Sequence, residues 1–202
     1  MPRPDRSRAA LIETAGTLFR RQGYAATGLN QILDDAGVKA GSLYHHFPGG
    51  KQELAAAVVE AAGADIEQLL LAALAQDVPV TAVVDGWLDL LIAGLAADCR
   101  DGCPVEPIAT ESVHASELMR RAAARAFDGW CAAISQRLRA EKWSGERADE
   151  TALAVISVIE GALMLSRTRG DAAALNSART AVHAVLAAGR QKSRPTSSTR
   201  TE

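Results

Sequence analysis

The chain is short of aromatic residues and of cysteines. Phe, Trp and Tyr make up 4% of its 202 residues, whereas apolar residues together make up 48%, so a core must rest on Ala, Leu, Val and Ile. Three cysteines are an odd number, which argues against a disulfide framework and fits a reducing cytoplasm. Alanine-rich chains with few β-branched runs favour helix. These shortages predict an all-α protein.

Long apolar runs and catalytic signatures are lacking as well. No stretch of about 18 uncharged apolar residues occurs, and no apolar signal core follows the first arginines, so neither a membrane span nor secretion is expected. The patterns GxSxG and HExxH, a Walker loop, and GxGxxG followed by an acid do not occur. We therefore expect a cytoplasmic protein that is not an enzyme, uses no cofactor and does not bind a membrane.

Charge is unevenly distributed along the chain. The net charge is −2, yet residues 1–51 hold seven Lys or Arg against four acids, and residues 190–202 hold four against one. The stretch between them is therefore strongly acidic. A basic head on an acidic body predicts local contact with a polyanion, although scatter among surface charges would produce the same counts.

Apolar periodicity predicts about nine helices. We expect a three-helix head over residues 1–50, a helical body over 51–189, and a disordered Ser/Thr/Arg-rich tail over 190–202. The helices are expected near 5–22, 28–36, 39–46, 51–75, 80–98, a short stretch ending near 113, 116–142, 148–167 and 172–189. The apolar run LAVISVIEGALML inside 148–167 predicts burial on more than one side.

Residues 27–54, TGLNQILDDAGVKAGSLYHHFPGGKQEL, carry the main chemical signature of the chain. Thr27 is placed to cap a short helix, Gly37 makes a turn, and a second short helix follows, so the segment predicts a helix-turn-helix. Eight helical residues span about 12 Å, and the major groove of DNA is about 12 Å wide. Leu43 and Phe47 can share a buried face, which leaves the other side of the second helix for DNA.

The spelling AGVKAGSLYHHF, with Gly23-Tyr24 and Thr27 before it and Lys51 after it, resembles the TetR family of one-component transcriptional repressors. The resemblance is strong over about residues 8–55. FPGGKQELA (47–55) and GCPVEPIATE (102–111) resemble the branch that contains lincomycin- and flavonoid-responsive repressors of drug-efflux genes. The family implies that the third helix reads bases and that residues around it contact backbone phosphates. The candidates for base contact are Lys39, Ala40, Gly41, Ser42 and His45, and those for phosphate contact are Thr27, Tyr44, His46 and Lys51.

The same resemblance implies a homodimer, joined through the helices near 148–167 and 172–189, on a palindromic operator in double-stranded DNA. It also implies release by a small, mostly apolar effector. Apolar residues of the middle helices could line an effector pocket, or they could simply be core. The candidate pocket residues are Trp87, Leu91, Glu111, Met119, Phe127, Trp130, Glu160 and Met164.

Two other functions stay open. Cys99, Cys103 and Cys131 could sense oxidants, although their spacing is not CxxC. Alternatively, the chain could be a small-molecule-binding or enzymatic helical protein with a vestigial helix-turn-helix. No metal site is expected at His45-His46, because adjacent helical residues diverge by about 100° and no further ligand is close in sequence.

Overall fold

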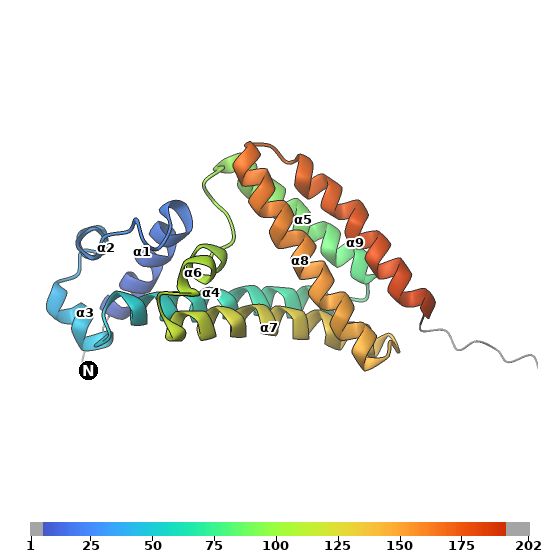
Figure 1. Cartoon of the computed structure of the whole chain (residues 1–202), viewed down its shortest axis with the longest axis horizontal. Helices are drawn as coiled ribbons and strands as arrows, with labels where there is room; N and C mark the ends of the chain where they lie inside the picture. The colour runs from blue at the N-terminus through green and yellow to red at the C-terminus, as the bar shows by residue number, and fades with distance from the viewer. Residues whose placement is uncertain (1–5, 193–202) are drawn as a thin grey trace, which may run out of the picture. The chain divides into compact units, whose positions relative to one another are not determined.

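The computed structural model describes residues 6–192, and all regular elements within that range are α-helices (Figure 1). The all-α prediction is confirmed, with helix ends close to those expected. The helices are α1 (Ser7–Gln22), α2 (Leu29–Ala36), α3 (Ala40–His46), α4 (Lys51–Leu74), α5 (Val80–Ala97), α6 (Glu106–Ser112), α7 (Glu117–Ala140), α8 (Gly145–Arg169) and α9 (Ala173–Lys192). The last helix continues to Lys192, and the rest of the tail expected over 190–202 lies outside the described residues.

The described residues form two compact units. Unit 1 takes its residues from Met1–Leu69 and Ala93–Trp130, and unit 2 from Leu70–Ile92 and Cys131–Glu202. Unit 1 therefore contains α1 to α3, the greater part of α4, α6 and the first half of α7. The functional boundary that the sequence suggests near residue 50 stays a prediction.

The core of the first three helices follows the predicted apolar face of α1. Leu11, Ala15 and Phe19 are fully buried, and α2 contributes Ile32 at 0% exposure. The chain leaves α2 through Gly37, whose φ of 63° lies in the left-handed region, so its backbone N–H can close onto the carbonyls of Asp34 and Leu33. This turn starts the chain toward α3, as the sequence predicts.

The expected cap of α2 is wrong. The N-cap residue is Gly28, with no side-chain cap hydrogen bond. The Thr27 hydroxyl instead donates to the carbonyl of Gly23 at 2.6 Å and accepts from Gln22 at 3.1 Å. Thr27 thus closes the turn behind α1, because its side chain folds back rather than forward along the chain.

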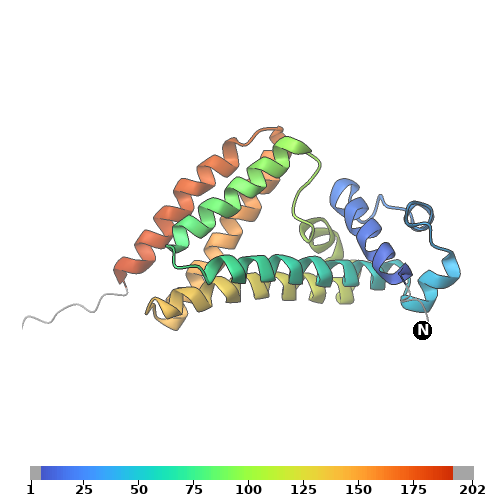
Figure 2. The same cartoon turned by 180° about the vertical axis from the view of Figure 1, so that it is seen from behind.

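In unit 2, α8 and α9 lie side by side as an antiparallel pair (Figures 1 and 2). Val155 and Ile159 of α8 are buried, and so are Leu175 and Val182 of α9. The opposite side of α8 is not covered, since large apolar side chains there are about half exposed or more: Leu153 at 61%, Met164 at 52% and Leu165 at 50%. The sequence predicts that α8 is buried on more than one side, whereas within a single chain its apolar side chains are buried on one side and exposed on the other.

Among the described helices, α5 is long and apolar enough to cross a membrane by length and composition alone, with a mean hydropathy of 1.7 over Val80–Ala97. It carries two acids, which both have partners on α9. Asp85 lies 2.9 Å from both Arg179 and His183, and Asp89 lies 2.5 Å from Arg179. Both acids of α5 are therefore held by side chains of α9 within unit 2.

A close helix approach in unit 1 gives a stability prediction. A Cβ atom on Gly63 of α4 would lie 2.7 Å from the Cβ of Ala126 of α7, whereas one on Gly86 of α5 would meet no atom within 4 Å. Overpacking costs about 1–3 kcal/mol, which exceeds the roughly 0.5–1 kcal/mol that alanine gains over glycine in a helix. We expect Gly63→Ala to lower the free energy of unfolding, measured by urea denaturation, and the matched Gly86→Ala to raise it. Equal effects of the two substitutions would contradict the close approach.

Candidate nucleic-acid interface

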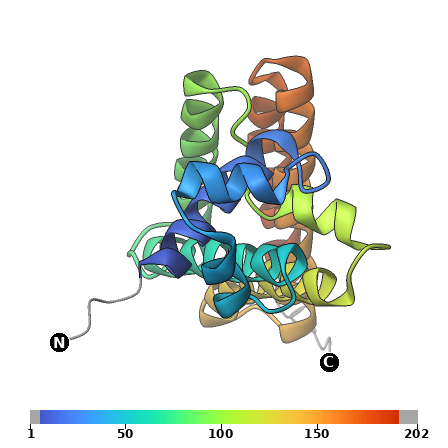
Figure 3. The same ribbon diagram turned by 90° about the vertical axis from the view of Figure 1, so that its left-hand side faces the viewer.

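The third helix presents a polar face over two buried anchors. Leu43 is 0% exposed and Phe47 is 2% exposed, as the i, i+4 spacing predicts. Figure 3 shows α1, α2 and α3 toward the viewer. Tyr44 is 53% exposed. The remaining predicted contacts on this helix are also accessible: Lys39, Ala40, Gly41 and His45 are exposed, and Ser42 and His46 are half-buried.

Short-range hydrogen bonds set the direction of α3. Lys39 is its N-cap in an extended conformation, and the N–H groups of Ser42 and Leu43 donate to the Lys39 carbonyl at 2.9 and 3.3 Å. Beyond the helix, Glu53 in the first turn of α4 accepts from the backbone N–H of Gly49 at 2.7 Å, which ties the loop after α3 to the start of α4. The helix is thus fixed at both ends by the segments that flank it.

Lys51, at the first position of α4, is held beside the turn that follows α1. Its Nζ donates to the backbone carbonyl of Tyr24 at 2.6 Å and lies 4.2 Å from the centre of the Tyr24 ring. Burial lowers the pKa of Lys51, and the negative charge of Glu111 partly opposes this by raising it. An ammonium has three N–H donors, so Lys51 keeps donor capacity for a phosphate while it holds Tyr24.

Thr27 does not fit the contact role that the resemblance implies. Its side chain is 1% exposed, and its hydroxyl is used by Gly23 and Gln22. A phosphate outside the protein cannot reach that hydroxyl in this conformation. We therefore correct its role to positioning of the turn between α1 and α2.

Sequence reasoning missed a carboxylate partner of the turn after α1. Glu111, on α6, accepts hydrogen bonds from the backbone N–H groups of Tyr24 at 2.9 Å and Ala25 at 2.6 Å. It was predicted to line an effector pocket, and the structure instead turns it toward the head. The partners are 86 and 87 residues apart along the chain, so no local pattern signals the contact.

The other predicted pocket residues are divided between the two units. In unit 1, Met119 and Trp130 are core at 0% and 3% exposure, and the Trp130 indole donates to the carbonyl of Gly63 at 3.0 Å. Phe127 packs edge-on against Trp130, with ring centres 5.2 Å apart. In unit 2, Trp87, Leu91 and Glu160 are half-buried and Met164 is exposed. As one effector pocket, this set stays a prediction.

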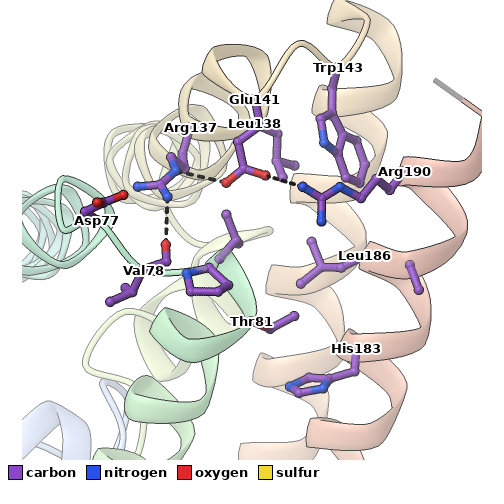
Figure 4. Close-up of a pocket in the computed structure, with 13 residues that line it drawn as sticks. Asp77, Val78, Thr81, Arg137, Leu138, Glu141, Trp143, His183, Leu186 and Arg190 are labelled. Carbon is purple, nitrogen blue, oxygen red and sulfur yellow. Dashed lines mark hydrogen bonds and ion pairs between the residues drawn. The ribbon is translucent and has the colours of Figure 1, made fainter. Parts of the chain in front are cut away.

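A cavity of about 820 Å³ lies within unit 2, and none of the eight predicted pocket residues lines it (Figure 4). Arg137 crosses it to the chain that follows α4: it donates to the carbonyls of Leu74, Gln76 and Val78, and it pairs with Glu141 at 3.1 Å. The guanidinium is therefore committed to holding the α4–α5 connection. The volume is sufficient for a small molecule, but the Arg137 guanidinium in the lining already has its hydrogen-bond and ion-pair partners within the protein.

The remaining candidates for chemistry are the cysteines and the possible metal ligands. Cys99 is exposed, Cys103 is buried and Cys131 is half-buried, and none of these three described residues forms a disulfide. Among residues 6–192, no group of three or more His, Cys, Asp or Glu side chains is arranged to hold a metal ion. The redox-sensing alternative stays a prediction.

Comparison with known proteins agrees with the geometry of the head and extends it to the body. A family model described as bacterial regulatory proteins, tetR family, matches residues 11–58. A second, described as transcriptional regulator LmrA/YxaF-like, C-terminal domain, matches residues 79–181, which is half of the chain.

Curated relatives match over most of their length. The chain is 36% identical to the uncharacterized HTH-type transcriptional regulator YxaF of Bacillus subtilis, over 82% of this chain and 87% of that protein. It is 34% identical to the HTH-type transcriptional regulator LmrA of the same organism, over 80% and 87%.

Solved structures share the fold. A TetR transcriptional regulator from Legionella pneumophila superposes with a TM-score of 0.79 at 20% identity, over 91% of this chain and 98% of that one. A TetR regulator from Chloroflexus aurantiacus gives 0.76 at 26%, over 93% and 97%. The chain belongs to the TetR family of bacterial transcriptional regulators, with a DNA-binding helix-turn-helix and a C-terminal domain of the LmrA/YxaF-like type.

Proposed function

We propose that this protein is a ligand-responsive repressor that binds a palindromic operator as a homodimer and leaves it when a small, mostly apolar effector binds. The observation that carries the proposal is the outward face of α3, where polar side chains are exposed above the buried Leu43 and Phe47. Seven helical residues span about 10 Å, which fits a major groove about 12 Å wide.

The side chains of this face divide by chemistry into two groups. Lys39, Ser42 and His45 carry donors or acceptors that can reach base edges, and Gly41 permits close approach of the backbone. Tyr44 and His46 lie at the end of α3, and Lys51 follows a few residues later at the positive end of α4, where a phosphate is favoured. Base contacts would select the sequence, and phosphate contacts would fix the register.

The uncovered side of α8 supports the dimer. Leu153, Met164 and Leu165 are exposed apolar side chains on one helix, and exposed apolar area of this kind marks an association surface. A twofold axis through this surface would pair identical faces, and a twofold dimer places two reading helices on half-sites of a palindrome.

Effector release requires two states with different DNA affinity. An effector moves their populations only by its own difference in affinity for the two states, and a change from 1:99 to 99:1 requires about 5.5 kcal/mol. A mostly apolar effector can supply this by burying its surface in one state only.

Base reading by α3 can be tested by selection from random duplexes. We expect the wild type to return a palindrome. Lys39→Ala and Ser42→Ala should change the preferred bases by about 1–3 kcal/mol per lost contact, whereas Tyr44→Phe should weaken all duplexes alike because it loses a phosphate contact. A wild-type selection without any palindrome would contradict the proposed function and favour a vestigial helix-turn-helix.

The phosphate contact of Lys51 can be tested by salt titration of operator binding. Each phosphate neutralised adds about 0.9 to the slope of log affinity against log salt, so Lys51→Gln should lower the slope by about one unit per half-site. Lys142→Gln removes the same charge in unit 2, on the turn after α7, and should leave the slope unchanged. Equal slopes for wild type and Lys51→Gln would remove Lys51 from the phosphate contacts.

The dimer surface can be tested by adding charge to α8. Met164→Glu and Leu165→Glu place a carboxylate on the exposed apolar side, so we expect monomers in sedimentation equilibrium and weaker operator binding. Leu90→Glu on α5, a side chain that is 69% exposed, is the matched control and should remain dimeric. If all three variants stay dimeric, the association surface lies elsewhere.

A further inference from the structure

The turn after α1 is held by a carboxylate from α6. Both oxygens of Glu111 are used: Oε1 accepts from the N–H of Tyr24 at 2.9 Å and Oε2 from the N–H of Ala25 at 2.6 Å. Hydrogen bonds to a charged acceptor are roughly twice as strong as neutral ones. Two adjacent amides on one carboxylate also fix its orientation, so this contact constrains the turn in both position and angle.

Gly23 makes the contact possible. Its φ of 88° lies in the region that favours glycine, and a Cβ atom at this position would lie 2.8 Å from Oε1 of Glu111. Any other residue there would be strained and would also push the carboxylate away. The glycine after α1 therefore has a role beyond ending the helix: it gives α6 access to the backbone.

The same residue, Tyr24, links Glu111 to Lys51. Its N–H is held by Glu111, and its carbonyl accepts from Lys51 Nζ at 2.6 Å. Glu111 also acts on Lys51 electrostatically and tends to raise the pKa of the ammonium, which burial lowers. One residue of the turn thus connects a carboxylate of α6 to the cation at the start of α4.

The segment before α6 adds ion pairs to the end of α1. Asp101 lies 3.3 Å from Arg20 and 3.0 Å from Arg21, and Asp98 lies 3.4 Å from Arg21. These side chains are partly exposed, and exposed pairs contribute little individually. The hydrogen bonds of Glu111 therefore restrict the turn after α1 more than the ion pairs of Asp98 and Asp101 do.

We propose that Glu111 is a positioning residue for DNA binding: by holding the turn after α1, and through it Lys51, it makes operator affinity depend on the position of α6. The inference rests on the proposed function. A hydrogen bond of 2.6–2.9 Å is lost when it lengthens by about 1 Å, so a small displacement of α6 suffices to free the turn. The head can thus respond to a change in α6 without any change in α3 itself.

The test is Glu111→Gln in the full-length protein. An amide offers one oxygen, so one of the two N–H groups loses its acceptor and faces an NH₂ group. We expect hydrogen exchange at Tyr24 and Ala25, followed residue by residue by NMR without DNA, to accelerate about tenfold or more. Operator affinity should fall by a similar factor. Glu117→Gln, whose carboxylate pairs with Arg120 and Arg121 on the surface, is the control and should change neither quantity.

A double variant separates positioning from general destabilisation. If Glu111 acts through Lys51, Glu111→Gln combined with Lys51→Gln should weaken operator binding by less than the product of the two single effects. Multiplicative effects would overturn the proposal. So would unchanged exchange at Tyr24 and Ala25, or faster exchange with unchanged operator affinity.

Measurements on the wild-type protein cover two further cases: a Glu111→Gln variant that does not fold, and a protein that selects no operator. If Glu111→Gln does not fold, exchange in the wild type decides: Ala25 is exposed in a turn, so slow exchange of its amide supports the clamp and fast exchange overturns it. If the wild type selects no operator, the proposed function fails and the positioning role fails with it. Exchange measured without DNA would still show whether Glu111 holds the turn, so the two failures are distinguishable.

Discussion

The arrangement of the DNA-binding head depends on the burial of two side chains beneath α3. A helix of seven residues is not stable in water by itself, because nucleation costs more than so few hydrogen bonds return. Leu43 at 0% exposure and Phe47 at 2% supply the missing free energy through packing. They also select which side of the helix faces outward. The same two residues therefore decide that the helix forms and that its polar side chains are available to DNA.

The elements around α3 act as a frame with backbone contacts at both ends. The turn at Gly37 and the bond from Gly49 to Glu53 are local, and both follow from residues next to the helix. The hold on the preceding turn is not local, since Glu111 comes from α6. A head fixed only by local contacts would keep one geometry regardless of the body. Because Glu111 of α6 also holds the head, a displacement of α6 would change the geometry of the head.

The sequence predicted the features that depend on neighbouring residues. Helix positions follow from apolar periodicity, and the buried and exposed sides of α3 follow from the spacing of Leu43 and Phe47. It failed where a side chain chooses between partners. The Thr27 hydroxyl could cap the N-terminus of α2 or bond to the turn before it, and in the structure it donates to the carbonyl of Gly23. It also failed for Glu111 and for Arg137, whose partners lie about 60 to 90 residues away and become neighbours only in the folded chain.

The charge of the head also depends on residues that are distant in the sequence. The excess of basic residues over 1–51 predicted local contact between the head and a polyanion. In the structure, Arg20 and Arg21 are paired with Asp98 and Asp101, so part of that excess is neutralised within unit 1. Fewer cations remain for phosphate contact than the count implies, and nonspecific attraction falls accordingly. Under the proposed function, operator binding then rests on a few well-placed contacts, and the residues that position those contacts matter as much as the residues that touch DNA.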